Sequence, residues 1–313
     1  MDDTTEIQKM LKAQNIYTGT ITPYQKNGGK KDYLLDNNRL LRMSKSPLDE
    51  QGKLQNVQSV PLAPHIHFSG SFVISDGTWN CLILDYIQGR DLWRMAQELS
   101  DDQKVKLGQD VAAFLNELHL ITDEKYDIGH YVPTIARFAG SWKNGHMEYA
   151  DWLTGKLSRM ELDLESKKTI ERALVYIQTN RDALDSQAGA KLLHNDLHPS
   201  NIIVDGNGNL AGVIDWECSQ FGEADFELTN FFEWCITYPP EKGKPLEIVL
   251  QTMLANLPDI PPLDCLEKRM TIYQLEHELN QLVWHGRAQE EKRIRQMDDW
   301  LNGRVASFLN SWC

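Results

Sequence analysis

The feature that most constrains this chain is a short predicted hairpin beyond its midpoint. The apolar run 202–204 predicts one strand, and residues 210–214 predict the returning strand. Between them, residues 205–209 read Asp-Gly-Asn-Gly-Asn, a sequence rich in turn-forming residues. Because paired strands in a hairpin run antiparallel, we expect Asp215, after the second strand, to lie beside Asn201, before the first.

Two further polar residues precede this hairpin. His194 and Asp196 belong to the run His-Asn-Asp-Leu-His-Pro-Ser-Asn, which ends at Asn201. A carboxylate beside an amide supplies the hard oxygen ligands that Mg²⁺ takes together with waters and nucleotide phosphates. Asn201 and Asp215 therefore predict a magnesium site, and Asp196 is placed where it would orient an acceptor hydroxyl.

The composition indicates a substantial hydrophobic core and a surplus of acidic residues. A chain of 313 residues, 41% of them hydrophobic, is long enough for two modest domains or one large one. Its 32 basic and 45 acidic residues give a net charge of −13, which argues against a general surface for nucleic acid or anionic membrane. The sequence leaves the oligomeric state open.

The sequence also indicates a compartment. It has no apolar run of signal-peptide length at its amino terminus and no stretch of about 18 or more apolar residues. Its five cysteines include no Cys-x-x-Cys pair, which argues against a disulfide framework and against a zinc site. We therefore expect a soluble protein of the reducing cytoplasm.

The pattern His-x-Asp-x4-Asn, followed by a hairpin and an aspartate, resembles the catalytic and metal loops of protein-kinase-like phosphotransferases. Its form here, with Ile-Asp-Trp at 214–216, is similar to that of the aminoglycoside phosphotransferase and choline kinase superfamily. The resemblance implies an α+β, protein-kinase-like two-lobed fold. A small nucleotide-binding lobe with a five-stranded antiparallel sheet is expected over 1–88, ending in the hinge, and a larger, mainly helical catalytic and substrate lobe over 89–313.

The predicted elements of the first lobe fit that expectation. Residues 4–14 predict an amphipathic helix, and residues 48–58 a second helix. The segments 66–68 and 71–74 predict a hairpin that 79–84 closes on its other side. Three earlier strands are predicted at 20–24, 32–35 and 39–43.

The resemblance implies a nucleotide site in this lobe. Gly28 and Gly29 would let the backbone approach phosphates, although a Gly-Gly turn is equally typical of an ordinary hairpin. Arg42 stands where the family usually has a lysine, and Glu50 stands where that cation has its carboxylate partner. Lys45 is the alternative cation, and Glu50 has an alternative interpretation as a surface helix residue.

A second nucleotide contact is implied at the interlobe hinge, within the run Leu-Asp-Tyr-Ile-Gln-Gly-Arg-Asp-Leu at 84–92. Backbone groups near Asp85 and Ile87 would bind adenine there. Beyond it, the sequence predicts a helix capped at Ser100 and ending near residue 120. Further helices are predicted at 147–160 and 164–185, and three in 246–312 that include 266–284 and 290–309.

The resemblance assigns roles to the central residues. ATP or GTP would lie between the lobes, with Arg42 at its phosphates and Mg²⁺ on Asn201 and Asp215. Asp196 would orient or deprotonate the acceptor hydroxyl, and His194 would brace the loop by hydrogen bonds. His198 would contact phosphate or pack against Trp216.

An aminoglycoside-type antibiotic is the first expectation for the acceptor. A choline or ethanolamine kinase is the alternative, because the segment 230–234 is similar to forms found there and Trp216 and Trp234 could receive a quaternary ammonium. A catalytically silent nucleotide-binding module is a third possibility, but such a module would not need Asp196, Asn201 and Asp215 together.

Acidic residues crowd the sequence after the metal loop, and they suggest a cationic acceptor. For any one of them, a solvated helix face is the simpler interpretation. Glu223 and Glu227 stand where the family usually has aspartates. The resemblance implies that this segment and a later helix border the acceptor. The substrate residues it implies are Glu217, Glu227, Glu233, Trp234 and Glu276, with Glu223, Asp225 and Glu278 adding negative charge nearby.

Overall fold

The computed structural model describes residues 3–27, 30–36, 38–127, 140–185 and 188–312. The chain forms two compact units, and both are discontinuous in sequence. Unit 1 comprises Met1–Leu99 and Pro199–Cys218, and unit 2 comprises Ser100–His198 and Ser219–Cys313. The predicted division of the chain into lobes after residue 88 stays a prediction.

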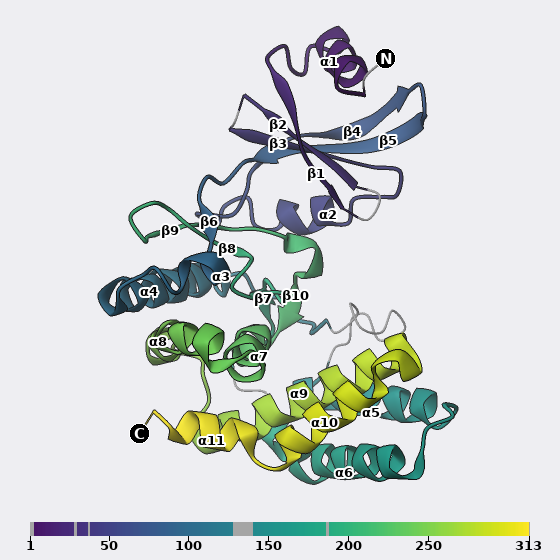
Figure 1. Ribbon diagram of the computed structural model, residues 1–313, viewed down its shortest axis with the longest axis vertical. Helices are drawn as coiled ribbons and strands as arrows, with labels where there is room; N and C mark the ends of the chain where they lie inside the picture. The colour runs from purple at the N-terminus through teal and green to yellow at the C-terminus, as the bar shows by residue number, and fades with distance from the viewer. Residues whose placement is uncertain (1–2, 28–29, 37, 128–139, 186–187, 313) are drawn as a thin grey trace. The chain divides into compact units, whose positions relative to one another are not determined.

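Unit 1 is built on a five-stranded antiparallel sheet with the strand order β1-β2-β3-β5-β4 (Figure 1). This confirms the sheet that the sequence predicted. Its strands are β1 Ile21–Asn27, β2 Lys30–Leu35, β3 Arg39–Ser44, β4 Ile66–Ile74 and β5 Gly77–Asp85.

The prediction of two separate segments at 66–68 and 71–74 was wrong, because β4 runs through both. Gly70, which lies between the two predicted segments, pairs with Cys81 of β5. A Cβ atom at Gly70 would lie 2.8 Å from the ring of Phe68, so the glycine makes room for that ring without ending the strand.

Helix α1, Asp3–Ala13, closes the core of unit 1 at one end of the sheet (Figure 1). Its Ile7 and Leu11 are fully buried and belong to the same hydrophobic cluster as strand residues such as Leu41 and Met43. A helix with apolar residues at this spacing presents one face to the sheet, as the sequence predicted. The shorter helix α2, Glu50–Gln55, packs against the 3₁₀ turn η3, Trp216–Cys218.

The central hairpin also belongs to unit 1 and forms as predicted. The Asp205 carboxylate accepts the backbone N–H groups of Asn207 and Asn209 at 2.8 and 2.9 Å, and Gly208 takes the left-handed conformation with φ of 88°. Two strands of the hairpin and a third short strand form a small sheet in the order β6-β8-β9: β6 Arg90–Asp91, β8 Ile202–Val204 and β9 Leu210–Val213.

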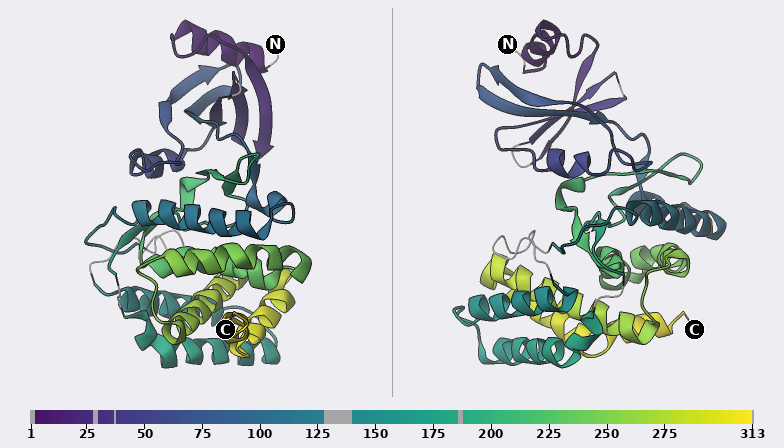
Figure 2. Two further views of the ribbon diagram at one scale, coloured as in Figure 1. Left: turned by 90° about the vertical axis from the view of Figure 1, so that its left-hand side faces the viewer. Right: turned by 180° about the vertical axis from the view of Figure 1, so that it is seen from behind.

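The described part of unit 2 is mainly helical and includes a pair of short strands (Figure 2). The predicted cap at Ser100 is confirmed, because its side chain and that of Gln103 form a reciprocal capping box. The helices are α4 Asp101–Leu118, α5 Trp142–Leu157, α6 Leu164–Asn180, α7 Thr229–Thr237, α8 Pro240–Asn256, α9 Leu263–His285, α10 Glu290–Leu301 and α11 Arg304–Asn310. The strands are β7 Lys191–Leu193 and β10 Gln220–Gly222, which pair antiparallel.

Two features of unit 2 differ from the predictions. The single helix predicted over 290–309 was wrong: it divides into α10 and α11 at Gly303, whose φ of 80° is incompatible with a continuing right-handed helix. In addition, α8 begins at Pro240, so the described part of the region beyond that residue holds four helices and not three.

Gly108 of α4 lets α4 and α8 approach closely, since a Cβ atom at this position would lie 2.6 Å from the side chain of Thr252 on α8.

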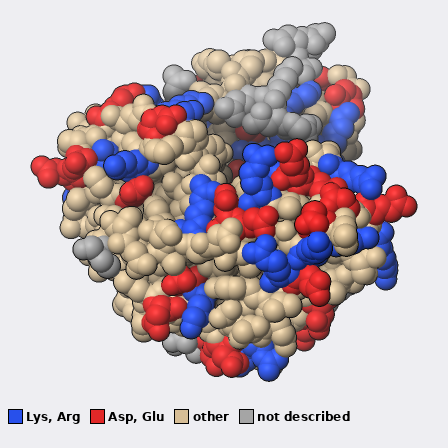
Figure 3. All heavy atoms as spheres, turned by 60° about the horizontal axis from the view of Figure 1, so that its bottom comes forward, with Lys and Arg blue, Asp and Glu red and all other residues tan. Residues whose placement is uncertain are grey.

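Acidic and basic side chains are mixed on the face of the molecule that Figure 3 shows. Ion pairs link neighbouring charges on the helices of unit 2, including Arg172–Asp298, Lys168–Glu165 and Arg295–Glu291. This face therefore is not a continuous acidic surface, despite the net charge of −13. None of the described helices combines the length and the apolar character needed to cross a membrane.

Candidate active site

Arg42 lies on β3 of unit 1 with a carboxylate on each side. Its guanidinium forms a short ion pair with Glu50, at the start of α2, and bonds to both carboxylate oxygens of Asp32 on β2, at 3.2 and 3.3 Å. Burial alone would lower the pKa of Arg42, but Glu50 and Asp32 outweigh that effect and raise it. The structure thus brings Arg42 and Glu50 together, as the sequence predicted.

The alternative cation, Lys45, has a different environment. Its ammonium group pairs with the Asp76 carboxylate at 3.0 Å and donates to the Asp76 carbonyl at 2.9 Å, near the turn between β4 and β5. Arg42 is therefore the cation that this fold fixes beside Glu50, whereas Lys45 is exposed and tied to another turn.

Asn201 and Asp215 flank the open end of the hairpin. The backbone N–H of Ile214 donates to the carbonyl of Asn201 at 3.0 Å, and Asp215 is the next residue along the chain. Asp215 adopts a φ of 69°, an unusual conformation for a residue other than glycine. Burial raises the pKa of Asp215, and the neighbouring carboxylate of Glu217 raises it further.

The charged residues around Arg42 and Asp215 include more carboxylates than cations. Four carboxylates, those of Asp32, Glu50, Asp215 and Glu217, interact with two cations, Arg42 and Lys30. Lys30 pairs with Glu217 at 2.6 Å. A divalent cation would relieve this excess, so the donor chemistry fits Mg²⁺.

The described residues do not provide a complete metal site by themselves. No group of three or more His, Cys, Asp or Glu side chains among them is arranged to hold a metal ion. Mg²⁺ needs only one or two carboxylates when waters and nucleotide phosphates complete its shell, so an incomplete protein site agrees with a nucleotide-linked metal.

The other residues predicted to contact the nucleotide are Gly28, Gly29, Asp85 and Ile87. Gly28 and Gly29 lie outside the described residues. The Asp85 carboxylate is bound by His65 and His67, at 3.0 and 2.6 Å, and hydrogen bonds from both outweigh its burial and lower its pKa. Ile87 packs over Gly212 of β9, where a Cβ atom would lie 3.0 Å from its side chain.

In unit 2, a buried carboxylate fixes the loop that contains His194 and Asp196. Both oxygens of Glu227 accept backbone N–H groups, from His194 at 2.6 Å and from Asn195 at 3.0 Å. Burial raises the pKa of Glu227 to about 7, despite these two hydrogen bonds. His194 is itself fully buried and accepts the N–H of Asp196 on its Nδ1 at 3.3 Å.

The Asp196 side chain is partly exposed, at 32%. Its Oδ1 accepts a hydrogen bond from the amide of Asn230, on α7, at 3.1 Å. His198, two residues on, stacks on Trp234 with ring centroids 4.9 Å apart, a contact that the sequence did not predict. Trp216 is fully buried in unit 1 and donates its indole N–H to the Val213 carbonyl.

Most of the acidic residues that suggested a cationic substrate face the interior of unit 2. Glu227 holds the loop, and Glu276 is buried against the His146 imidazole at 2.7 Å. Glu233 is more accessible, with 20% of its side chain exposed near His277. The other inward carboxylates are Glu223 with Tyr126, Asp225 with Arg269, and Glu278 with Arg293.

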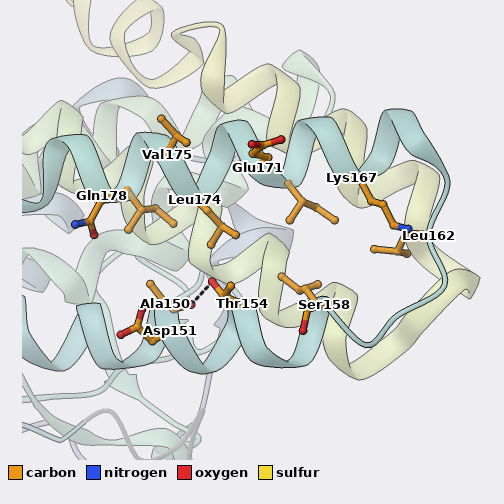
Figure 4. Close-up of a pocket in the computed structure, with 13 residues that line it drawn as sticks. Ala150, Asp151, Thr154, Ser158, Leu162, Lys167, Glu171, Leu174, Val175 and Gln178 are labelled. Carbon is orange, nitrogen blue, oxygen red and sulfur yellow. Dashed lines mark hydrogen bonds between the residues drawn. The ribbon is translucent and has the colours of Figure 1, made fainter.

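Two hollows in unit 2 differ in their relation to these residues. A groove of about 590 Å³ lies between α5 and α6, and none of the predicted site residues lines it (Figure 4). A much smaller cavity, of about 20 Å³, is lined by Asn195, Asn230, Glu276 and His277, among others. Of the predicted acceptor residues, Glu276 thus lies at the smaller hollow.

Asn230 and Asp32 make the contacts that the sequence analysis missed. Asn230 belongs to the segment 230–234, which is similar to choline kinases. Its contact with Asp196 could not be predicted from neighbouring residues, because the two are 34 residues apart in the sequence. Asp32 was assigned only to a strand, although its position opposite Arg42 could have indicated the contact, since the two residues are partners in the β2–β3 register.

The sequence matches the family model described as the phosphotransferase enzyme family over residues 60–251, which is more than half of the chain. The chain belongs to this family. The matched residues include the loop at 194–196, the hairpin and α7. The candidate residues Asp196, Asn201 and Asp215 therefore lie within the region that matches the family model.

Relatives and solved structures agree with this assignment. Hygromycin-B 4-O-kinase of Escherichia coli is 40% identical over 43 residues, a match that spans 14% of this chain and 12% of that protein. The GDP complex of wild-type aminoglycoside 2'-phosphotransferase-IIIa superposes with a TM-score of 0.68 at 18% identity, over 98% of this chain and 99% of its own.

A thermostable mutant of aminoglycoside phosphotransferase APH(4)-Ia, in a ternary complex with AMP-PNP and hygromycin B, has a TM-score of 0.67. It is 17% identical over 95% of this chain and 98% of its own. The streptomycin–ATP–APH(2")-IIa ternary complex has a TM-score of 0.64 at 19% identity, over 98% of both chains. These likenesses confirm the predicted protein-kinase-like α+β fold.

Proposed function

We propose that this chain transfers the γ-phosphate of ATP or GTP to a hydroxyl group of a small cationic molecule, most specifically an aminoglycoside. The observation that supports this most strongly is the loop at 194–196. Its backbone is fixed by the buried Glu227 carboxylate, while the carboxylate of Asp196 stays partly exposed. A carboxylate on a rigid loop is what an acceptor hydroxyl needs for orientation.

The proposed reaction depends on positioning and charge neutralisation more than on covalent chemistry by the protein. The acceptor oxygen forms a bond to the γ-phosphorus, and the bond from that phosphorus to the β–γ bridging oxygen breaks. Asp196 accepts the hydrogen bond, and then the proton, of the attacking hydroxyl. The nucleoside diphosphate is the leaving group.

Unit 1 would supply the nucleotide contacts. Arg42 is held between Glu50 and Asp32, which take three of its five N–H donors, so two donors remain for phosphate oxygens. Asn201 and Asp215 would hold Mg²⁺, which when bound neutralises the negative charge of the phosphates. The ion pair with the buried Glu50 helps to hold Arg42 in this position.

Several observations favour an aminoglycoside over choline as the acceptor. Solved structures of similar fold contain hygromycin B, kanamycin or streptomycin. In this chain Trp216 is fully buried, so it does not present a ring face to a quaternary ammonium. Glu233 and Trp234 are partly exposed, and the side chain of Glu217 in unit 1 is 42% exposed, so a cationic acceptor could meet these residues.

A panel of acceptors tests the proposed function. The purified chain would be assayed with Mg²⁺ and either ATP or GTP against hygromycin B, kanamycin, streptomycin, choline, ethanolamine, homoserine and a macrolide. We expect phosphorylation of an amino sugar, with a KM that rises with salt, because the Debye length falls from about 8 Å near 0.15 M to about 3 Å at 1 M.

Hydrolysis of the nucleotide without acceptor is the control for this panel. Preference for a neutral acceptor, or an amine KM that does not respond to salt, would remove the cationic acceptor from the proposal. Failure to transfer phosphate to any acceptor, with nucleotide binding intact, would favour the silent nucleotide-binding module.

The metal residues can be tested by binding alone. We expect Asp215→Ala to weaken Mg²⁺-dependent nucleotide binding more than Asn201→Ala does, because a charged ligand is lost in the first variant and a neutral one in the second. Isothermal calorimetry with a non-hydrolysable ATP analogue, with Mg²⁺ and with EDTA, would measure the difference. Unchanged affinities in both variants would place the metal on other residues.

A further inference from the structure

Asn230 lies at the second position of α7, and its side chain reaches back to the loop at 194–196. Its Nδ2 donates to the carbonyl oxygen of Asn195 at 3.3 Å and to Oδ1 of Asp196 at 3.1 Å. A primary amide nitrogen has two protons, so one side chain can make both hydrogen bonds at once. The same residue therefore contacts the backbone before Asp196 and the carboxylate of Asp196 itself.

Asn195 has a left-handed backbone conformation. Its φ is 62°, in a region that asparagine adopts more readily than most residues other than glycine. Three side chains hold it there: Glu227 accepts its N–H, Gln220 donates to its Oδ1 at 3.2 Å, and Asn230 donates to its carbonyl. Both peptide planes that flank Asn195 are thus fixed, which sets the direction in which Asp196 leaves the backbone.

The element that presents Asn230 is itself firmly anchored. Phe231 and Phe232, the next two residues of α7, are almost completely buried. The side-chain amide of Gln274, on α9, donates to the Thr229 carbonyl at 2.8 Å. Asn230 therefore extends from a rigid helix start, which limits how far its amide can follow any movement of Asp196.

We propose that Asn230 is a positioning residue that sets the orientation of the Asp196 carboxylate. This inference rests on the proposed function, in which Asp196 accepts the proton of the acceptor hydroxyl. The amide holds Oδ1 toward α7, while Oδ2 lies 3.7 Å from Nε2 of His198, so Asn230 and His198 contact different oxygens of the carboxylate. Because an amide does not titrate, it donates at every working pH, and a hydrogen bond to the ionised form of a carboxylate favours that form.

Asn230→Asp is the sharpest kinetic test, because it keeps the shape of the side chain and removes both donors. We expect kcat to fall about 10–100-fold in Asn230→Asp and in Asn230→Ala, because a displacement of a reacting group by about 1 Å can lower the rate about 10²-fold. The KM for nucleotide should stay within about twofold of the wild-type value. In Asn230→Asp the acidic limb of the kcat profile should also move to higher pH, since a second carboxylate disfavours ionisation of the first.

Asn116→Asp is the matched control. The amide of Asn116 donates to the carbonyl of Asn256 elsewhere in unit 2 at 3.3 Å, the same distance as from Asn230 to the Asn195 carbonyl. The variant removes this donor. We expect Asn116→Asp to leave kcat and its pH profile unchanged. If kcat of both Asn230 variants stays within twofold of wild type, or if they differ from it only as Asn116→Asp does, the proposal is overturned.

Crystal structures of the wild-type chain and of Asn230→Asp provide a readout that does not need turnover. We expect the variant to show a rotated Asp196 carboxylate, with or without a flipped peptide after Asn195. An unchanged Asp196 in the variant would overturn the proposal even if kcat fell. If Asp196 rotates but the wild-type chain phosphorylates no acceptor, the positioning role stands and the proposed function fails.

Discussion

Asp196→Asn is expected to lower kcat by roughly 10²–10⁴-fold, the usual contribution of a general base. The asparagine has the same shape, and its Oδ1 can still accept the hydrogen bond from Asn230, so the loop should stay in place. What is lost is the group that accepts the hydroxyl proton. Steady-state kinetics with the preferred acceptor, together with calorimetry of nucleotide binding, would measure the effect.

The nucleotide affinity of this variant should stay near the wild-type value, because the proposed phosphate and metal contacts are made by Arg42, Asn201 and Asp215 and not by Asp196. Asp110→Asn is a suitable control, since it removes a carboxylate from the same unit in an i,i+4 pair with Lys106 on α4. A wild-type kcat in Asp196→Asn would exclude Asp196 from the mechanism.

The largest expected effect on stability comes from the buried pair of Asp225 and Arg269. The side chains are 1% and 0% exposed and are joined by two hydrogen bonds, of 2.6 and 2.7 Å. Arg269 also donates to the carbonyls of Ala183 and Asp185, so it links α9 to the end of the 3₁₀ turn at 181–184. Asp225→Ala would leave this guanidinium buried without its counter-charge.

We expect Asp225→Ala to lower the free energy of unfolding by about 3–5 kcal/mol, the usual cost of breaking one side of a buried ion pair. Urea unfolding followed by circular dichroism would measure it. The double variant Asp225→Leu with Arg269→Met should recover most of the loss, because it removes both charges and keeps apolar volume.

Glu291→Ala is the matched surface control. It breaks a pair with Arg295 in which both side chains are largely exposed, at 90% and 71%, and such pairs contribute little. We expect no measurable change in the unfolding midpoint. A loss in Asp225→Ala no larger than in this control would show that the buried pair does not stabilise unit 2.

Local sequence signals predicted the elements near the candidate site well. The turn at 205–209 forms because the Asp205 carboxylate bonds the next residues, and the cap at Ser100 forms because its partner Gln103 is three residues away. These interactions join neighbours in the chain, so the residues that make them can be read directly from the sequence. The pairing of β8 with β9 follows from the same short turn.

The positions of helix ends and of short strands were harder to predict. Gly303 divides α10 from α11, whereas one helix was predicted over 290–309. The strand β10 has only three residues and exists because it pairs with β7, a distant segment of the chain, with Phe221 opposite Leu192. A segment this short has no periodicity of its own, so only its partner identifies it.

By itself the sequence determined the hairpin, the capped helices and the chemical types of the site residues, because all of these depend on residues close together in the chain. Only the tertiary structure decided which carboxylates face the interior. Glu227 meets His194 across 33 residues, Asp225 meets Arg269 across 44, and Glu276 meets His146 across 130. A carboxylate in a helical pattern has the same sequence signature whether water or a buried partner faces it, and the cost of burying its charge is offset only by partners that folding brings from distant segments.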